Sequence, residues 1–380
     1  MRRVESAGEH VEQAPGEGEF PVGHKSRFTR AAVGVAALAL AATACGKTSG
    51  EAEKDDAEKG GGSSASASSS KGIGLAYDVG GRGDQSFNDS AYTGYEKARG
   101  EFGLGGQDLE PNDGESDADK VARLTQLAKQ GFDPIIGVGF AYAPAIKAVA
   151  PKYPKTTFGI VDDDTVKAAN VADLVFHEEQ GSYLAGVAAA KATKNKHVGF
   201  VGGVDVPLIH KFGAGFKAGV ASVDPEIKVE EQYLTEKAED GGFSSPNLGK
   251  EAAKGQLDKG ADVLYAAAGL SGQGVIEEAA AAGKWAIGVD SDQYRQKPLA
   301  KYRKHILTSV LKDVGGAVYD LTKSVVDGSP KTGETRFDLA SGRVGLSESN
   351  PAYGKMTELT AAVEKAEADI KAGKIDVPTS

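Results

Sequence analysis

Cysteine is almost absent from this sequence of 380 residues, in which Cys45 is the only one. No disulfide can therefore form within the chain, and the fold must be stabilised by its core. Basic residues are outnumbered as well, and the net charge of -10 argues against nonspecific binding to nucleic acid. The hydrophobic content of 40% is typical of a globular protein, and the chain is long enough for two domains.

Several catalytic patterns are also missing. The body of the chain has no thiol, no Gly-x-Ser-x-Gly motif, and no metal-ligand spacing among His177, His197, His210 and His305. The run Asp162-Asp163-Asp164 could hold a metal or serve in acid–base chemistry, but a solvated turn after a strand is the favoured interpretation. The sequence therefore predicts a protein that is not an enzyme and that has no metal or other cofactor.

The N-terminal part has the pattern of an export signal. Lys25, Arg27 and Arg30 precede a mostly apolar run at residues 31–44, which is too short to span a bilayer as a mature helix. The run ends at Cys45, and this junction resembles a bacterial lipoprotein processing site, in which the cysteine is lipidated. The alternative is an ordinary signal peptide, with the cysteine as a bystander. We expect a protein that is lipid-anchored on the extracytoplasmic face of the cell membrane.

The composition changes again after the signal. Residues 1–44 are interpreted as an N-terminal extension and signal peptide, and residues 45–70 as a flexible tether. The tether is rich in Gly, Ser, Ala, Glu and Lys, and it has almost no large apolar residue with which to form a core. We expect the folded part to begin near Lys71.

Apolar strands alternate with helix-length segments from residue 71 onward. Strands are predicted near residues 73–78, 135–140, 157–161, 172–176, 197–201, 227–234, 263–267, 285–289 and 306–311. Helices are predicted at residues 143–150, 178–193, 207–221, 247–259, 274–282, 314–326 and 356–371, and a hairpin at 335–346. This alternation indicates an α/β fold with right-handed parallel crossovers, and its two rounds predict two similar lobes with a ligand between them.

Carboxylates and glycines follow many of the predicted strands. The residues at these ends are Asp78, Gly139-Phe140, Asp162, Gly202-Gly203, Gly269 and Asp290. Carboxylates accept hydrogen bonds from ligand hydroxyl or N–H groups, and glycines let a ligand approach the backbone. A single aspartate after a strand is more often a turn or cap residue, so the prediction of a site depends on the recurrence.

The first strand leads into a glycine-rich turn and then a helix that Ser86 or Asn88 is expected to open. The turn at residues 80–83 lacks the Gly-x-Gly-x-x-Gly spacing of a phosphate-binding loop. Only Lys312 supplies a cation at the strand ends, whereas a phosphate would need several. The sequence thus predicts a neutral ligand rather than a nucleotide.

Motifs along the body resemble those of the basic membrane protein family of bacterial lipoproteins, also called the purine nucleoside receptor type. They are residues 78–88, 136–140, 158–162, 179–186, 198–203, 207–216, 288–290 and 309–312, in the correct order. Members of that family are substrate-binding components of ABC importers. The resemblance implies a type I periplasmic-binding-protein fold of two Rossmann-like lobes joined by a hinge, here residues 71–176 plus 292–330 and residues 177–291 plus 331–380. It also implies a membrane permease as partner and a monomeric protein.

The resemblance further implies roles for individual residues. Phe87 and Phe243 match two rings that hold a purine base, with Phe212 competing for the second position. Asp162 matches the carboxylate at the purine N–H edge, and Asp290 and Lys312, one from each lobe, match the pair at the ribose hydroxyls. The residues that complete the pocket are Asp78 and Gly269, with Ser86 and Asn88 as secondary candidates.

Two alternatives to a nucleoside-import protein stay open. Related folds bind a sugar or furanose with the same strand-end carboxylates. A receptor that senses the same ligand for a signalling partner would also have a similar binding module.

Overall fold

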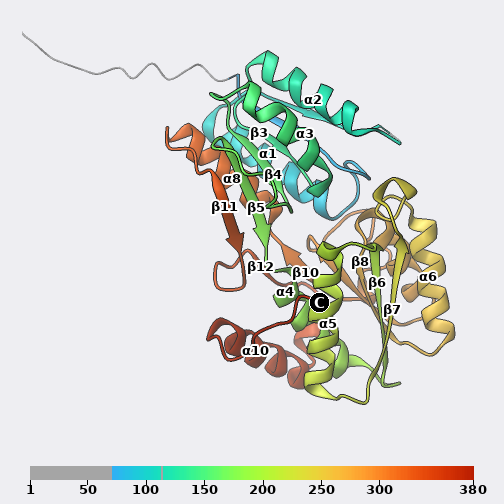
Figure 1. The fold of residues 1–380 in the computed structure, drawn as a ribbon. Helices are drawn as coiled ribbons and strands as arrows, with labels where there is room; N and C mark the ends of the chain where they lie inside the picture. Colours follow the sequence, from blue (N-terminus) through green and yellow to red (C-terminus); the bar gives the residue numbers. More distant parts are fainter. Residues whose placement is uncertain (1–70, 113) are drawn as a thin grey trace, which may run out of the picture. The chain divides into compact units, whose positions relative to one another are not determined.

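The computed structural model describes residues 71–112 and 114–380 (Figure 1). The predicted signal segment, the tether and the lipidation residue Cys45 lie outside these residues. Within the described part of the chain, no helix is long and apolar enough to cross a membrane.

The first sheet has six parallel strands in the order β11-β5-β4-β3-β1-β2. Its strands are β1 (Ile73–Ala76), β2 (Gly106–Leu109), β3 (Ile135–Gly137), β4 (Phe158–Val161), β5 (Val171–Phe176) and β11 (Gly333–Phe337). Its helices are α1 (Phe87–Phe102), α2 (Asp117–Gln130), α3 (Ala143–Val149) and α8 (Val314–Val326). Side chains of β1 alternate, so that Ile73 and Leu75 join the core formed with α1 and α8, whereas Ala76 joins that of α2 and α3. The sheet and these helices form the first lobe.

The second sheet has the order β12-β10-β9-β8-β6-β7, and only β12 is antiparallel to its neighbour. Its strands are β6 (His197–Val204), β7 (Lys228–Thr235), β8 (Val263–Ala267), β9 (Trp285–Asp290), β10 (Ile306–Lys312) and β12 (Val344–Leu346). Its helices are α4 (Glu178–Ala192), α5 (Pro207–Val223), α6 (Pro246–Asp258), α7 (Gly272–Ala281), α9 (Pro351–Gly354) and α10 (Thr357–Lys371). Helices α4 and α5 cover one face and α6 and α7 the other. The sheet and these helices form the second lobe, and the α/β class with two Rossmann-like lobes is confirmed.

Short 3₁₀ helices complete the described elements: η1 (Phe140–Tyr142), η2 (Ala150–Lys152), η3 (Ala238–Asp240), η4 (Gly269–Ser271) and η5 (Arg303–His305). Glycines bring α4 and α5 into close contact. A Cβ atom on Gly186 would lie 2.2 Å from the carbonyl oxygen of Phe216, and one on Gly219 would lie 2.0 Å from that of Tyr183. These small residues let the two helix backbones approach each other closely.

The chain passes between the lobes three times, from β5 to α4, from β10 to α8, and from β11 to β12. This pairing differs from the predicted lobe boundaries in two places. Residues 292–330 were assigned to the first lobe, but β10 pairs with β9 in the second sheet; residues 331–380 were assigned to the second lobe, but β11 pairs with β5 in the first. The hairpin prediction for residues 335–346 is wrong, because β11 and β12 join different sheets. An apolar strand pattern fits either sheet, so it carries no information about which sheet a strand joins.

Candidate functional site

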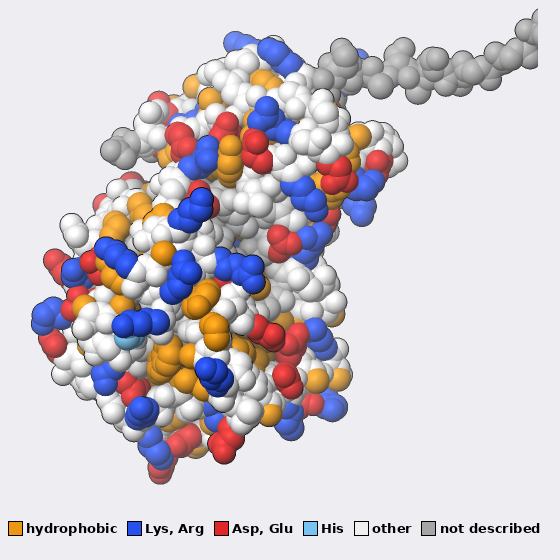
Figure 2. Space-filling view, turned by 180° about the vertical axis from the view of Figure 1, so that it is seen from behind, with side chains coloured by type: hydrophobic (Ala, Val, Ile, Leu, Met, Phe, Trp, Pro, Cys, Tyr) orange, Lys and Arg blue, Asp and Glu red, His pale blue; other side chains and the backbone are white. Residues whose placement is uncertain are grey.

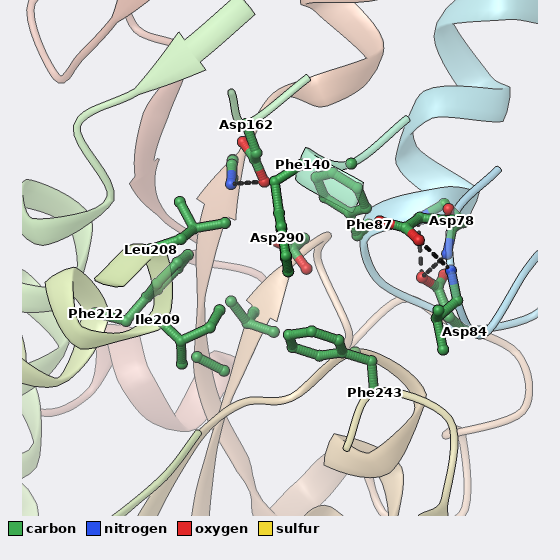
Figure 3. A pocket seen from close by; sticks show the side chains of 17 residues that line it. Asp78, Asp84, Phe87, Phe140, Asp162, Leu208, Ile209, Phe212, Phe243 and Asp290 are labelled. Carbon is green, nitrogen blue, oxygen red and sulfur yellow. Dashed lines mark hydrogen bonds and ion pairs between the residues drawn. The ribbon is translucent and has the colours of Figure 1, made fainter. Parts of the chain in front are cut away.

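A cavity lies at the carboxyl ends of strands from both sheets (Figure 3). Parallel sheets bind ligands at this edge. The lining residues are Asp78, Val79, Asp84, Phe87, Asn88, Gly139, Phe140, Asp162, Leu208, Ile209, Phe212, Phe243, Ala267, Gly269, Val289, Asp290 and Lys312. The structure therefore brings together all the residues that the sequence predicted for binding except Ser86, which contacts Asp290.

Lys312, the last residue of β10, contacts two buried carboxylates. Its Nζ atom lies 2.6 Å from Oδ2 of Asp162 and 3.2 Å from Oε1 of Glu178, and all three side chains are at most 5% exposed. Burial lowers the pKa of Lys312, but the attraction of Asp162, Glu178 and Asp290 outweighs it and raises the pKa overall. The ammonium therefore stays charged, and it bridges the lobes because Asp162 follows β4 of the first sheet.

Asp290 is the last residue of β9 and has a different partner. The Ser86 hydroxyl of the first lobe donates a hydrogen bond to Oδ2 of Asp290 at 2.5 Å. Asp290 and Lys312 were predicted to come from different lobes, but they end adjacent strands of the second sheet. The prediction followed the erroneous assignment of β10, and the correction leaves both residues in the cavity.

Asp162 and Asp290 share an uncommon backbone conformation. Their φ angles are +68° and +63°, in the left-handed region, which aspartate enters more readily than most residues do. Such conformations cost about 1–3 kcal/mol and collect at functional sites. The chain thus has an aspartate of positive φ at corresponding strand ends of the two sheets, and both carboxylates line the cavity.

The start of α1 is capped by Asp84 rather than by the predicted Ser86 or Asn88. The Asp84 carboxylate accepts hydrogen bonds from the backbone N–H groups of Ser86, Asn88 and Asp89, at 2.8–3.1 Å. Ser86 precedes the helix, but its side chain makes no capping bond and turns to Asp290 instead. Because capping is done by Asp84, the side chains of Phe87 and Asn88 are available to the cavity.

Aromatic rings reach the cavity from both lobes. Phe87 begins α1, Phe243 lies between β7 and α6, and Phe212 lies on α5 (Figure 3). Phe243 packs closely over Gly203, where an added Cβ would lie 2.4 Å from the ring. Phe212 is almost fully buried and also lines the cavity, so it stays a competitor for the second ring position.

Burial alters the titration of the cavity carboxyls. It raises the pKa of Asp78 to about 6 and that of Asp84 to about 7, in both cases against hydrogen bonds from backbone N–H groups that lower it. Burial also raises the pKa of Asp162 to about 7 against the attraction of Lys312, and it raises that of Asp290. Burial therefore opposes ionisation of all four cavity carboxyls, and the hydrogen bonds and nearby cations offset it only in part.

Some residues in or beside the cavity were not predicted. Asp84 lies in a glycine-rich loop where the tripeptide Arg82-Gly83-Asp84 gave no sign of a capping role. Glu178 begins α4, where an acidic residue is ordinary, and Leu208 and Ile209 follow Pro207 in an apolar stretch typical of a core helix. Gly139 and Phe140 were noted at a strand end but not assigned to the site. Only spatial proximity identifies these residues.

The described residues, 71–112 and 114–380, contain no group of three or more His, Cys, Asp or Glu side chains arranged to hold a metal ion. In the run of aspartates after β4, only Asp162 lines the cavity. Asp163 accepts hydrogen bonds from Thr165, and Asp164 pairs with Arg336 at 3.2 Å. Asp163 and Asp164 therefore form the partly solvated turn that the sequence analysis favoured.

Comparison with known sequences identifies a family. Residues 73–380 match the sequence model of the PnrA-like ABC transporter substrate-binding proteins. The ABC transporter nucleoside-binding protein BmpA of Lactococcus lactis is 36% identical over 320 residues, which cover 80% of this chain and 88% of that protein. A CD4+ T-cell-stimulating antigen of Listeria monocytogenes is 35% identical over 324 residues, covering 80% and 87%. An uncharacterized lipoprotein of Pyrococcus horikoshii is 35% identical over 288 residues, covering 72% and 68%.

Solved structures of similar fold include solute-binding proteins of ABC transporters. One from Aeropyrum pernix superposes with a TM-score of 0.69 at 29% identity, covering 81% of this chain and 93% of that one. Another, from Conexibacter woesei, has a TM-score of 0.63 at 22% identity and covers 81% and 98%. These similarities confirm the predicted type I periplasmic-binding-protein fold.

Proposed function

This chain belongs to the family of PnrA-like ABC transporter substrate-binding proteins, and we propose that it captures a purine nucleoside between its two lobes and delivers it to a membrane permease. The relative BmpA, which is named as nucleoside-binding, supports this choice of ligand. The family is one of substrate-binding proteins, and in our proposal the nucleoside is bound and released unchanged. None of the cavity-lining residues is a histidine, cysteine or serine that could act as a nucleophile or its base.

The observation that carries the proposal is the combination of aromatic and hydrogen-bonding groups in one cavity. Phe87 and Phe243 present aromatic faces, and stacking of a base on a ring contributes roughly 1–3 kcal/mol with little preference among purines. Asp162, Asp290 and Lys312 supply carboxylates and an ammonium. A neutral nucleoside matches this set, because it combines a flat apolar base with N–H donors and vicinal hydroxyls.

We assign the roles of the cavity residues from the side-chain atoms that are still free to bond to a ligand. Oδ1 of Asp162 is buried and has no hydrogen-bond partner among the described residues, so in our proposal it accepts from an N–H group of the base. Asp290 and Lys312, side by side at the ends of β9 and β10, contact the ribose hydroxyls. Ser86 orients Asp290, while Asp78 and Gly269 complete the wall of the cavity.

The electrostatics disfavour a phosphorylated ligand. Lys312 is already engaged by Asp162 and Glu178, and Asp78, Asp84 and Asp290 add further carboxyls nearby. A phosphate would bring additional negative charge without a free cation to receive it. We therefore propose nucleosides and not nucleotides.

The anchor and the partners follow from the same assignment. We propose that Cys45 is lipidated and holds the protein at the extracytoplasmic membrane surface, in keeping with the relatives that are named lipoproteins. The partner is the permease of an ABC importer, and the protein acts as a monomer. We propose no nucleic-acid partner, because the net charge of the chain is -10 and acidic side chains lie among the basic ones on the face in Figure 2.

The test is isothermal titration of the purified protein with guanosine, inosine, adenosine, ribose and galactose. We expect heat from at least one nucleoside and none of comparable affinity from the sugars. Binding of a sugar with no response to nucleosides would overturn the base-stacking assignment and support the alternative of a sugar-binding protein. A signalling receptor would bind the same ligands, but deletion of its gene would leave nucleoside uptake by cells unchanged.

A further inference from the structure

The carboxylate of Asp84 is surrounded by hydrogen-bond donors. Oδ1 accepts from the backbone N–H groups of Ser86 at 2.9 Å and Asp89 at 3.1 Å. Oδ2 accepts from the backbone N–H of Asn88 at 2.8 Å and from its side-chain Nδ2 at 3.2 Å. Asp84 is only 2% exposed, so water cannot substitute for these partners. Both oxygens are thus used as acceptors.

This arrangement determines which way the amide of Asn88 points. The backbone N–H groups of Ser86, Asn88 and Asp89 point at both oxygens of Asp84 and favour its ionised form. That form accepts hydrogen bonds but donates none, so the NH₂ end of the Asn88 amide faces Asp84. The carbonyl oxygen Oδ1 of Asn88 must then face away from Asp84. It is buried, lacks a hydrogen-bond partner among the described residues, and belongs to a side chain that lines the cavity. The cavity thereby gains an acceptor from a residue that could equally have supplied a donor.

We propose that Asp84 is a positioning residue that fixes the amide orientation of Asn88, so that the site selects nucleosides whose base carries an N–H donor. Asp162 supplies a second unpartnered buried acceptor, its Oδ1 atom, to the same cavity. Two acceptors without a ligand donor would stay unsatisfied, which penalises a base that has none. The inference rests on the proposed nucleoside function and adds to it a criterion for the base.

The second lobe holds the loop that contains Asp84. Nε2 of Gln273 on α7 donates to the carbonyl oxygens of Gly83 and Asp84, each at 3.3 Å. Gln293 donates to the carbonyl oxygen of Gln85 at 3.2 Å, and the Ser291 hydroxyl to that of Ser86 at 2.8 Å. The orientation of Asn88 is therefore fixed in the arrangement in which both lobes line the cavity.

The first experiment compares ligands that differ in the donor. Adenosine carries an exocyclic amino group, and purine riboside lacks it and has no N–H on its base. We expect the purified protein to bind adenosine about tenfold or more tightly than purine riboside, and Asp84→Asn to reduce this ratio to about threefold or less, because an asparagine can both donate and accept. Equal affinities in the unaltered protein, or an unchanged ratio in the variant, overturn the inference. If no nucleoside binds the unaltered protein, the proposed function itself fails.

Asp89→Asn is the matched control. Asp89 also accepts two backbone hydrogen bonds in this loop, from Gly83 and Gln85, but does not bond to the side chain of Asn88. It should keep the adenosine preference, which separates amide orientation from general loop stability. Asp84→Ser, which retains a helix-capping side chain, is the second variant if Asp84→Asn does not fold.

A double-mutant cycle tests whether Asp84 acts through Asn88. Asn88→Ala should lower the preference for adenosine over purine riboside, and adding Asp84→Asn should change it by less than about twofold further. A large additional change would mean that Asp84 influences selectivity by another route, and the inference would fail.

Discussion

Asp162 in the first lobe and Asp290 in the second occupy corresponding strand ends with nearly the same φ angle, yet their partners differ. Each contacts a donor from the opposite lobe, Lys312 for Asp162 and Ser86 for Asp290. The first pair is an ion pair with an acceptor atom left over, and the second is a hydrogen bond to a neutral hydroxyl. The position at the strand end thus places each carboxylate in the cavity. The donor from the opposite lobe determines whether that carboxylate forms an ion pair or a hydrogen bond to a neutral group.

The largest expected effect comes from removing the cation of the ion pair between Lys312 and Asp162. Lys312→Met leaves Asp162 buried without its cation and Glu178 with only Lys211, 3.7 Å away, so we expect the free energy of unfolding to fall by about 3–5 kcal/mol. Ser86→Ala removes only a neutral donor from Asp290 and should cost about 1–3 kcal/mol. Urea unfolding of both variants measures the difference.

The control for this experiment is Lys217→Met. Lys217 pairs with Glu231 at 2.8 Å in a largely exposed position, so its loss should cost less than about 1 kcal/mol. Equal losses for the Lys312 and Ser86 variants would contradict the contrast between the two carboxylates.

The second prediction uses the raised pKa of Asp162, about 7. If the ionised carboxylate accepts from the base, nucleoside affinity should fall about tenfold for each pH unit below 7, since protonation must be reversed before binding. The unliganded protein should show the opposite trend from this group, because a folded-state pKa above the unfolded value adds stability as pH falls from 7 towards 4. Titration calorimetry and thermal unfolding from pH 5 to 8 measure the two trends.

Other carboxyls of the cavity also titrate in this range, because burial raises the pKa of Asp78 to about 6 and that of Asp84 to about 7. Lys312, Glu178 and Asp290 are the charged neighbours that act on Asp162 itself. Asp162→Asn isolates the contribution of the one carboxyl, because the remaining pH dependence belongs to its neighbours. An unchanged slope in that variant would assign the effect to those neighbours instead.

Sequence reasoning was most successful where topology determines position. The carboxyl ends of parallel strands meet at one edge, so aspartates such as Asp78, Asp162 and Asp290 could be predicted to share a cavity from strand prediction alone. Elements with weak apolar signals were missed: β2 is only partly buried, and α2 is rich in charged residues. Neither omission affected the predicted site.

The partners of these carboxylates could not be predicted in the same way. Whether β10 joins the first or the second sheet depends on long-range pairing, and the error moved Lys312 to the wrong lobe. Glu178 contacts Lys312, which is distant in sequence but close in space, and the role of Asp84 depends on the direction of its hydrogen bond with Asn88. Neither relation appears in residue spacing. The sequence thus predicts the carboxylates at the strand ends, whereas the residues that contact them are known only from the three-dimensional structure.

The third prediction concerns the aromatic contribution of each lobe. Phe87→Ala in the first lobe and Phe243→Ala in the second should each weaken nucleoside binding by about 1–3 kcal/mol, since each removes one stacking face. Phe212→Ala should instead mainly lower stability, because Phe212 packs in the core and is 3% exposed. Calorimetry and thermal unfolding on the three variants separate the effects. If Phe212→Ala weakens binding more than Phe243→Ala without loss of stability, the second ring is Phe212.

The smallest expected effect concerns Asp290, whose partner is the neutral hydroxyl of Ser86. Asp290→Asn preserves the left-handed backbone, which asparagine also adopts readily, and keeps an oxygen to accept the hydrogen bond from Ser86. Only the charge is lost, so inosine should bind about tenfold more weakly as hydroxyl groups lose a charged acceptor. Hypoxanthine, the free base, should bind unchanged, whereas Asp162→Asn should weaken both ligands. Equal losses for inosine and hypoxanthine in Asp290→Asn would show that Asp290 does not act at the ribose, because the free base has no hydroxyl groups for the carboxylate to bind.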